Sequence, residues 1–201
     1  MPHASAPYMS EHGDPEPITM PRVSLHVDPI GLPATARHYI RDLVYGANDG
    51  LITTFAVVSG ATGGALSSAA VLIIGAANLA ADGMSMGVGN LLAIRAHERV
   101  RAAEGLPEEE AYPWKHGAAT LIAFVVAGTV PLLPFLFGGI VGGRAVWSTV
   151  LTFTALFGIG ASRAALTKER WWAAGSETLG LGALVAAAAY GASALVAHLL
   201  R

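Results

Sequence analysis

The chain has 201 residues, of which 53% are hydrophobic and 13% are charged, and its formal net charge is −2. Soluble domains carry roughly 25% charged residues, so this composition argues against an ordinary soluble domain and indicates a membrane protein. The absence of cysteine excludes disulfides and thiolate metal sites, and the small net charge gives no reason to expect a nucleic-acid partner.

The first 36 residues are rich in proline and are predicted to form a disordered cytoplasmic tail. The tail contains His3, His12 and His26, scattered histidines that could bind metal weakly. Residues 37–201 are predicted to form one membrane domain.

Long uncharged runs predict five transmembrane helices, because about 20 apolar residues span a bilayer. We expect them at residues 36–62, 67–96, 115–141, 144–166 and 173–200. Gly63-Gly64 and Gly142-Gly143 mark tight hairpins, and Pro131 and Pro134 should kink or end the third helix. The predicted fold class is therefore an all-α integral membrane protein. A chain this short cannot enclose such helices in a polar shell, which argues against a large soluble protein with buried helices.

The basic residues predict the orientation. With five spans, ten of the 12 lysines and arginines fall on one side, and Arg144 and Arg201 fall on the other. By the positive-inside rule the N-terminus is cytoplasmic and the C-terminus lies outside. Four or six spans would scatter the basic residues over both sides. The alanine-rich composition and short loops favour a bacterial plasma membrane, and a vacuolar membrane in a eukaryote would keep the same topology.

A polar stripe interrupts the second predicted helix. Residues four apart share one helix face, so the stripe consists of Asn78, Asp82, Met86 and Asn90. A carboxylate inside a bilayer is costly and is by default a functional-site hypothesis. Carboxylate, amide and thioether ligands together suit a divalent metal softer than magnesium or calcium. The alternative is that Asp82 is structural, either protonated or hydrogen-bonded to a neighbouring helix.

A second acid, Asp49, lies in the first predicted helix. It is eight residues beyond Arg41, or about 12 Å deeper at the rise of an α-helix. The alternative is that Asn48-Asp49-Gly50 forms a turn, with Asp49 capping a helix that begins there.

Small residues recur in both of these helices. Pairs of small residues four apart allow helices to approach closely, which would bring Asp49 near the polar stripe. They could also build a dimer seam or be filler without a packing role. The glycines concerned are Gly46, Gly50, Gly83 and Gly87.

Further charged residues lie outside the apolar runs. The short acidic loop 97–114 could collect cations at a pore mouth, with His97, Glu98 and Glu104 as candidate metal-capturing residues, or it could simply be solvated. Glu177, near the start of the fifth helix, is either a helix-terminal charge or a proton-linked carboxylate.

Several segments together resemble the vacuolar iron transporter family over residues 37–200. These segments are Arg41 to Leu51, Ser59-Gly60-Ala61, Asp82 to Met86 with Gly89-Asn90, Leu166-Thr167, Gly175 to Gly182, and Tyr190-Gly191. The resemblance implies a five-helix homodimer whose pore lies between the subunits and is lined by the first two helices. It implies exchange of cytosolic ferrous iron, and often manganese, for protons. Asp49 and Met86 match the pore acid and pore methionine of the family.

The chain departs from the family pattern at two places. The long glutamate-rich insert of plant members is reduced here to the segment 97–114. The usual Gly-Glu-Tyr is Gly89-Asn90-Leu91, and an amide cannot titrate, so we hypothesise that Asp82 supplies the missing acid.

We therefore expect a transporter that lies in membrane lipid and moves ferrous iron or manganese out of the cytoplasm. We expect it to hold no resident cofactor. One alternative is a proton or small-solute channel that uses Asp82 without metal. Another is a non-transporting membrane scaffold whose polar stripe joins helices. An enzyme is the least expected class, because the sequence has no nucleophile–base motif or nucleotide-binding loop.

Overall fold

The structure is a computed structural model that describes residues 23–27, 29–137, 143–167 and 169–200. The described residues form five long helices, which confirms the all-α class. These helices are α1 (Leu32–Gly63), α2 (Ser68–Ala103), α3 (Pro113–Thr129), α5 (Arg144–Thr167) and α6 (Trp171–Leu199). A 3-10 turn, η1 (Val130–Leu132), and the short helix α4 (Leu133–Leu136) follow α3.

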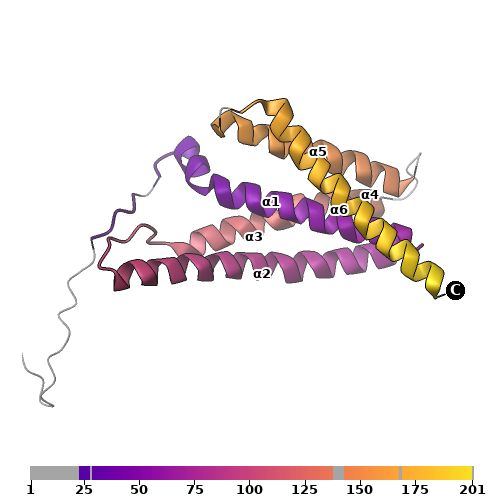
Figure 1. Ribbon diagram of the computed structural model, residues 1–201, viewed down its shortest axis with the longest axis horizontal. Coiled ribbons are helices and arrows are strands. Elements are labelled where there is room, and N and C mark those ends of the chain that lie inside the picture. Colours follow the sequence, from indigo (N-terminus) through magenta and orange to yellow (C-terminus); the bar gives the residue numbers. More distant parts are fainter. Residues whose placement is uncertain (1–22, 28, 138–142, 168, 201) are drawn as a thin grey trace, which may run out of the picture.

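The long helices run back and forth along the bundle (Figure 1). The starts of α1, α3 and α6 and the ends of α2 and α5 lie at one end, which we call the loop end. The hairpin between α1 and α2, the start of α5 and the end of α6 lie at the other. Helix α1 packs against α2, α3, α5 and α6, so it is the central helix.

Within the described part of the chain, four helical segments are long and apolar enough to cross a membrane, one fewer than the five expected. They are Ser68–Ala103, Pro113–Leu136, Arg144–Ala164 and Trp171–Leu199. Helix α1 has 32 residues, enough for about 48 Å, but it carries too many polar residues to meet the same criterion. Because other helices surround it, α1 does not need an apolar surface on all sides.

Two predicted boundaries differ from the observed ones at the loop end. Helix α2 continues to Ala103 because the charged residues after Ala96 are good helix formers, so the loop is shorter than predicted. Helix α1 begins at Leu32, and the segment before it is held by the loop: the Leu25 N–H donates to the Glu108 carbonyl at 2.7 Å. The last part of the predicted disordered tail is therefore structured. Residues 1–22 lie outside the described residues.

The predicted break in the third helix is confirmed. Helix α3 ends at Thr129, Pro131 lies in η1 and Pro134 lies in α4. Pro134 offers no backbone N–H at this break, and the Ser148 hydroxyl of α5 donates to the Pro131 carbonyl at 2.6 Å. The remainder of that predicted helix, residues 138–141, and Gly142 lie outside the described residues.

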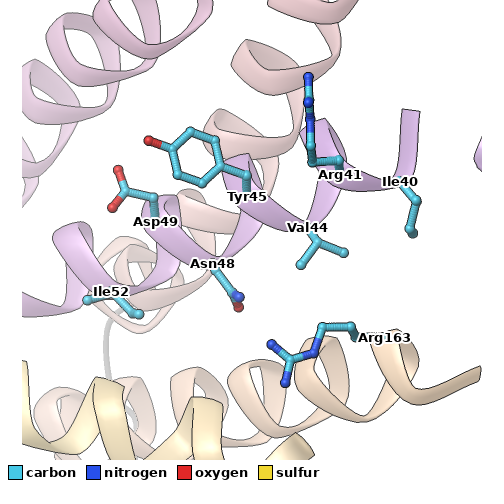
Figure 2. A pocket seen from close by; sticks show the side chains of 8 residues that line it. All are labelled: Ile40, Arg41, Val44, Tyr45, Asn48, Asp49, Ile52 and Arg163. Atoms are coloured by element: carbon cyan, nitrogen blue, oxygen red, sulfur yellow. The ribbon is translucent and has the colours of Figure 1, made fainter. Parts of the chain in front are cut away.

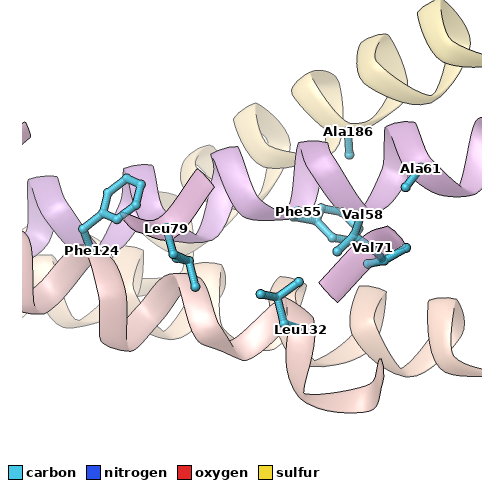
Figure 3. Packing of buried hydrophobic residues seen from close by; sticks show 8 residues of the cluster. All are labelled: Phe55, Val58, Ala61, Val71, Leu79, Phe124, Leu132 and Ala186. Atoms are coloured by element: carbon cyan, nitrogen blue, oxygen red, sulfur yellow. The ribbon is translucent and has the colours of Figure 1, made fainter. Parts of the chain in front are cut away.

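The apolar core lies between α1, α2 and α3 (Figure 3). Phe55 and Val58 of α1 contact a cluster contributed by α2, α3, η1 and α6. The other members of this cluster are Ala61, Val71, Leu79, Phe124, Leu132 and Ala186. This packing fixes α1 against α2, the two helices that carry the predicted site.

Candidate functional site

Asp49 lies in the middle of an unbroken helix. Helix α1 runs continuously from Leu32 to Gly63, so the alternative in which Asp49 caps a helix start is wrong. The Thr53 hydroxyl donates to the Asp49 backbone carbonyl at 2.8 Å, one turn further along. The carboxylate itself is partly buried and remains available for chemistry.

The polar stripe of α2 lies beside the buried face of that helix. Asn78, Asp82, Met86 and Asn90 are all partly buried. Leu79, Gly83 and Gly87, each directly after a residue of the stripe, are buried. The helical period therefore places the four side chains on one face, as the sequence predicted. This face reaches α1 at Asn90, whose Nδ2 donates to Asp42 Oδ1 at 2.8 Å.

Two cavities open beside these acids. The first, of about 490 Å³, is lined by Asp49, Asn48 and Arg163 among others (Figure 2). In this view Asp49 and Tyr45 point to one side of α1, whereas Asn48 points toward Arg163 of α5. The second cavity, of about 410 Å³, is lined by Met86, Asn90 and again Tyr45. Tyr45 therefore borders both spaces.

Asn90 belongs to a buried hydrogen-bond network that the sequence did not reveal. Its Nδ2 donates to Asp42 Oδ1 and to Thr120 Oγ1, both at 2.8 Å. The other oxygen of Asp42 accepts from His116 Nδ1 at 2.5 Å. The amide nitrogen is thus committed to an anchor between α1, α2 and α3, and only the amide oxygen is left for a metal.

Asn78 also has an unusual environment. Its Nδ2 is buried and has no hydrogen-bond partner among the described residues. The same is true of Asn48 Oδ1 on α1. Buried polar atoms are normally hydrogen-bonded, and of these two only Asn48 Oδ1, an acceptor in the cavity of Asp49, could also serve a cation.

The four predicted packing glycines contact α3, which corrects the expected pairing of α1 with α2. Added Cβ atoms on Gly46 and Gly50 would collide with the α3 carbonyls of Thr120 and Phe124, and Gly83 faces side chains of α3. A Cβ on Gly87 would lie 2.9 Å from the carbonyl oxygen of Gly117. These glycines therefore pack helices within one chain, which leaves no room for them in a dimer seam.

Glu177 is placed as a helix-end charge. Its carboxylate accepts a hydrogen bond from Arg163 Nη2 at 2.7 Å, and 63% of its side chain is exposed. Arg163 also lines the cavity that contains Asp49, so the pair lies at the rim of that cavity.

The three predicted capture residues of the loop do not form a cluster among the described residues. Glu98 is buried, and its Oε1 accepts from the backbone N–H groups of Glu109 and Glu110, both at 3.1 Å. His97 is exposed and lies 3.7 Å from Glu109, and Glu104 is exposed at the end of α2. Glu98 therefore holds the loop, and metal capture by these three residues remains a prediction.

The fold defines an all-α integral membrane protein whose central helix carries a partly buried acid, Asp49, beside a cavity. Comparison with known proteins names the group: the model of the VIT family matches residues 40–112 and 95–194, and the chain belongs to this family. Its members are transporters, not enzymes, as the sequence predicted.

Three relatives illustrate the similarity. Vacuolar iron transporter 2 of Oryza sativa subsp. japonica is 30% identical over 78% of this chain and 87% of its own length. Vacuolar iron transporter 1 of Eucalyptus grandis is 28% identical over 78% of this chain and 86% of its own. Vacuolar iron transporter 1 of Arabidopsis thaliana is 28% identical over 82% of this chain and 88% of its own length. The chain thus covers most of each relative.

Proposed function

We propose that the protein transports ferrous iron, manganese or both out of the cytoplasm in exchange for protons. The observation that carries the proposal is the position of Asp49: this partly buried carboxylate lines a cavity of about 490 Å³, and Tyr45 joins that cavity to the one lined by Met86 and Asn90. Membership of the VIT family and the names of the relatives support a metal as the transported ion. The function serves metal homeostasis and detoxification.

The chemistry of the side chains supports this substrate. Two carboxylates side by side are stabilised when a divalent cation lies between them, and Met86 adds a thioether one turn from Asp82. Amide oxygens of Asn78 and Asn90 could complete the coordination. A carboxylate must lose its proton before it binds a metal, so metal entry releases protons and protonation releases the metal. Opposite movements of metal and protons follow from the same two groups.

We further propose that α1 is a fifth span and that two copies enclose the pore. Helix α1 is the most polar of the long helices, yet it is central and carries Asp49. Tyr45, which borders both cavities, is 59% exposed in the single chain, so this face is open to a second copy. A dimer would place Asp49 of each chain on one water-accessible path.

The orientation follows from the charges. Arg37 and Arg41 at the start of α1, Arg95 and Arg99 near the end of α2, and Arg170 before α6 all lie at the loop end. We propose that this end faces the cytoplasm, in the plasma membrane of a bacterium or the vacuolar membrane of a eukaryote.

The test is metal flux in proteoliposomes with an imposed pH gradient, comparing ferrous iron, manganese, cobalt and zinc. Asp49→Asn should reduce flux at least about tenfold, the scale of loss when a metal site is damaged. Asp82→Asn should uncouple flux from the pH gradient, and Met86→Leu, of similar volume, should change the preference among metals. Glu104→Gln is the matched control because it removes an exposed carboxylate away from the cavities.

Other outcomes identify the competing functions. Proton flux that does not depend on metal would favour a proton channel. Absence of any flux, together with unchanged metal tolerance of cells that express Asp49→Ala, would favour a scaffold. Unchanged proton-coupled manganese flux in Asp82→Asn would refute the coupling role of Asp82.

A further inference from the structure

A cluster of histidines and one glutamate lies at the loop end, apart from the acids described above. The segment 23–27 runs along the loop, where the Glu108 N–H donates to the Val23 carbonyl at 2.9 Å. This pairing places His26 against His38 on the second turn of α1 and against Glu110 on the loop. Three segments that are distant in the sequence thus meet at one point.

The geometry of the three side chains fits a metal ion. One ligand atom from each of His26, His38 and Glu110 can be chosen so that all three lie within 4.8 Å of one another. His26 Nδ1 lies 3.3 Å from Glu110 Oε2, and His38 Nε2 lies 3.6 Å from Glu110 Oε1. The His26 side chain is only 6% exposed, so the cluster is not a chance gathering of surface residues.

A fourth histidine points at the same carboxylate. His116 Nε2 lies 3.1 Å from Glu110 Oε2, and the side chain of His116 is 5% exposed. Its Nδ1 donates to Asp42, which fixes the tautomer and leaves the lone pair of Nε2 directed toward Glu110. Histidines that bind metals usually donate their second ring N–H to a carboxylate in this way.

Three of the polar atoms that converge here are buried without a hydrogen bond to any described residue. His38 Nε2, His116 Nε2 and Glu110 Oε2 are buried, and none of the three has a hydrogen-bond partner among the described residues. The histidine–glutamate contacts are short but poorly aligned for hydrogen bonds. Buried groups left in this state are costly, and each such group needs an explanation. A bound cation supplies the missing partner to all three at once.

We propose that His26, His38 and Glu110 bind a divalent transition metal, with His116 as a fourth ligand positioned by Asp42. Imidazoles with a single carboxylate suit ferrous iron, manganese, cobalt or zinc, whereas magnesium and calcium prefer oxygen ligands. The site takes metal at the loop end, and its ligand His38 lies about 16 Å from Asp49 along α1, at a rise of about 1.5 Å per residue. Its role as a capture site rests on the proposed transport function, but metal binding itself does not.

The experiment uses the full-length protein, purified in detergent without a polyhistidine tag and grown with ¹⁵N-labelled histidine. Bound Mn²⁺ is examined by pulsed electron paramagnetic resonance, which detects imidazole nitrogens that coordinate the metal. The acids and the thioether of the transport site contain no imidazole, so this signal distinguishes histidine ligands from that site, and the variants show which histidines supply it. Cobalt titration followed by visible absorption gives the affinity.

The variants are His26→Ala, His38→Ala and Glu110→Gln, with His97→Ala and His198→Ala as controls. The controls are exposed histidines, one in the same region and one at the opposite end of the bundle. Each cluster variant should weaken cobalt binding at least about tenfold and reduce the nitrogen coupling, and the controls should change neither. His26→Ala alters a segment outside the helical bundle, so the test remains valid if another variant fails to fold.

The outcomes separate this proposal from the transport function. A wild-type protein without imidazole coupling, or one whose coupling survives in all three cluster variants, overturns the proposal. Loss of coupling in His97→Ala also overturns it, because the metal would then lie at the exposed loop face. If the wild-type protein transports no metal while the imidazole coupling depends on Glu110, the transport function fails and the metal site stands.

Discussion

Replacing Gly50 by alanine should separate α1 from α3 and destabilise the protein. A Cβ at this position would collide with the Phe124 carbonyl oxygen and lie 3.0 Å from the carbonyl carbon and the Cα of Phe124. These are backbone atoms, so no side-chain rotation relieves the collision and one helix must move. The adjacent residue is Asp49, so the same movement shifts the carboxylate relative to Asp82.

The magnitude follows from two opposing effects. Overpacking of a dense interior costs about 1–3 kcal/mol, and a rigid backbone neighbour places this variant at the upper end. Alanine gains about 0.5–1 kcal/mol over glycine inside a helix. The expected net loss for Gly50→Ala is therefore about 2 kcal/mol.

Gly60 provides a matched control on the same helix. A Cβ at Gly60 would lie 3.7 Å from the Ala189 carbonyl oxygen and 3.9 Å from Ser193 Cβ, which is ordinary contact. Gly60→Ala should therefore stabilise the protein by about 0.5–1 kcal/mol. Both variants are compared by the free energy of unfolding in mixed micelles and by metal flux. Equal stabilities of the two variants would refute the packing argument.

Two further predictions concern single polar residues. Asp42→Ala should lower the free energy of unfolding by at least about 2 kcal/mol, because it leaves buried donors on His116 and Asn90 without their acceptor. Asp42→Asn keeps one acceptor oxygen and should lower the free energy of unfolding by less. Equal losses in the two variants would contradict this account. Glu177→Gln should leave the pH dependence of metal flux unchanged, since the exposed ion pair of Glu177 with Arg163 is worth at most about 1 kcal/mol. Loss of that pH dependence in proteoliposomes would place Glu177 on the proton path.

The sequence was sufficient for the helices because their apolar runs and breakers are local signals. The break at Pro131 was predictable because proline removes a backbone N–H wherever it occurs. The extension of α2 to Ala103 was missed because hydropathy falls at Arg95, although the following residues favour a helix. The central position of the polar helix α1 is not a local signal, because its packing against other helices depends on the tertiary fold.

The candidate site was predictable only in part. The four-residue spacing from Asn78 to Asn90 places these residues on one face whatever surrounds the helix. The same spacing could not say which helix Gly83 and Gly87 contact, and α3 proved to be the neighbour. His26, His38, His116 and Glu110 carry no common spacing, because they come from four segments that meet only after folding.

Asn90 lies between the histidine cluster and the cavity of Met86, and its substitution tests how tightly it is coupled to Asp42. On one side its Nδ2 donates to Asp42, which holds His116. On the other it shares a cavity with Met86, one turn away on α2. Asn90→Asp keeps the shape but replaces a donor by a carboxylate 2.8 Å from Asp42 Oδ1.

Two like charges about 4 Å apart at an effective dielectric constant near 20 repel by about 4 kcal/mol, whereas Asn90→Ala only removes hydrogen bonds worth about 1–2 kcal/mol. At neutral pH the order of stability should therefore be wild type, then Asn90→Ala, then Asn90→Asp. When the pH is lowered, the introduced carboxyl gains a proton and can donate to Asp42. The difference in free energy of unfolding between Asn90→Asp and wild type, measured at the same pH, should therefore shrink. A deficit that does not depend on pH would show that Asn90 and Asp42 are not coupled, and that the histidine cluster and the acid pair act independently.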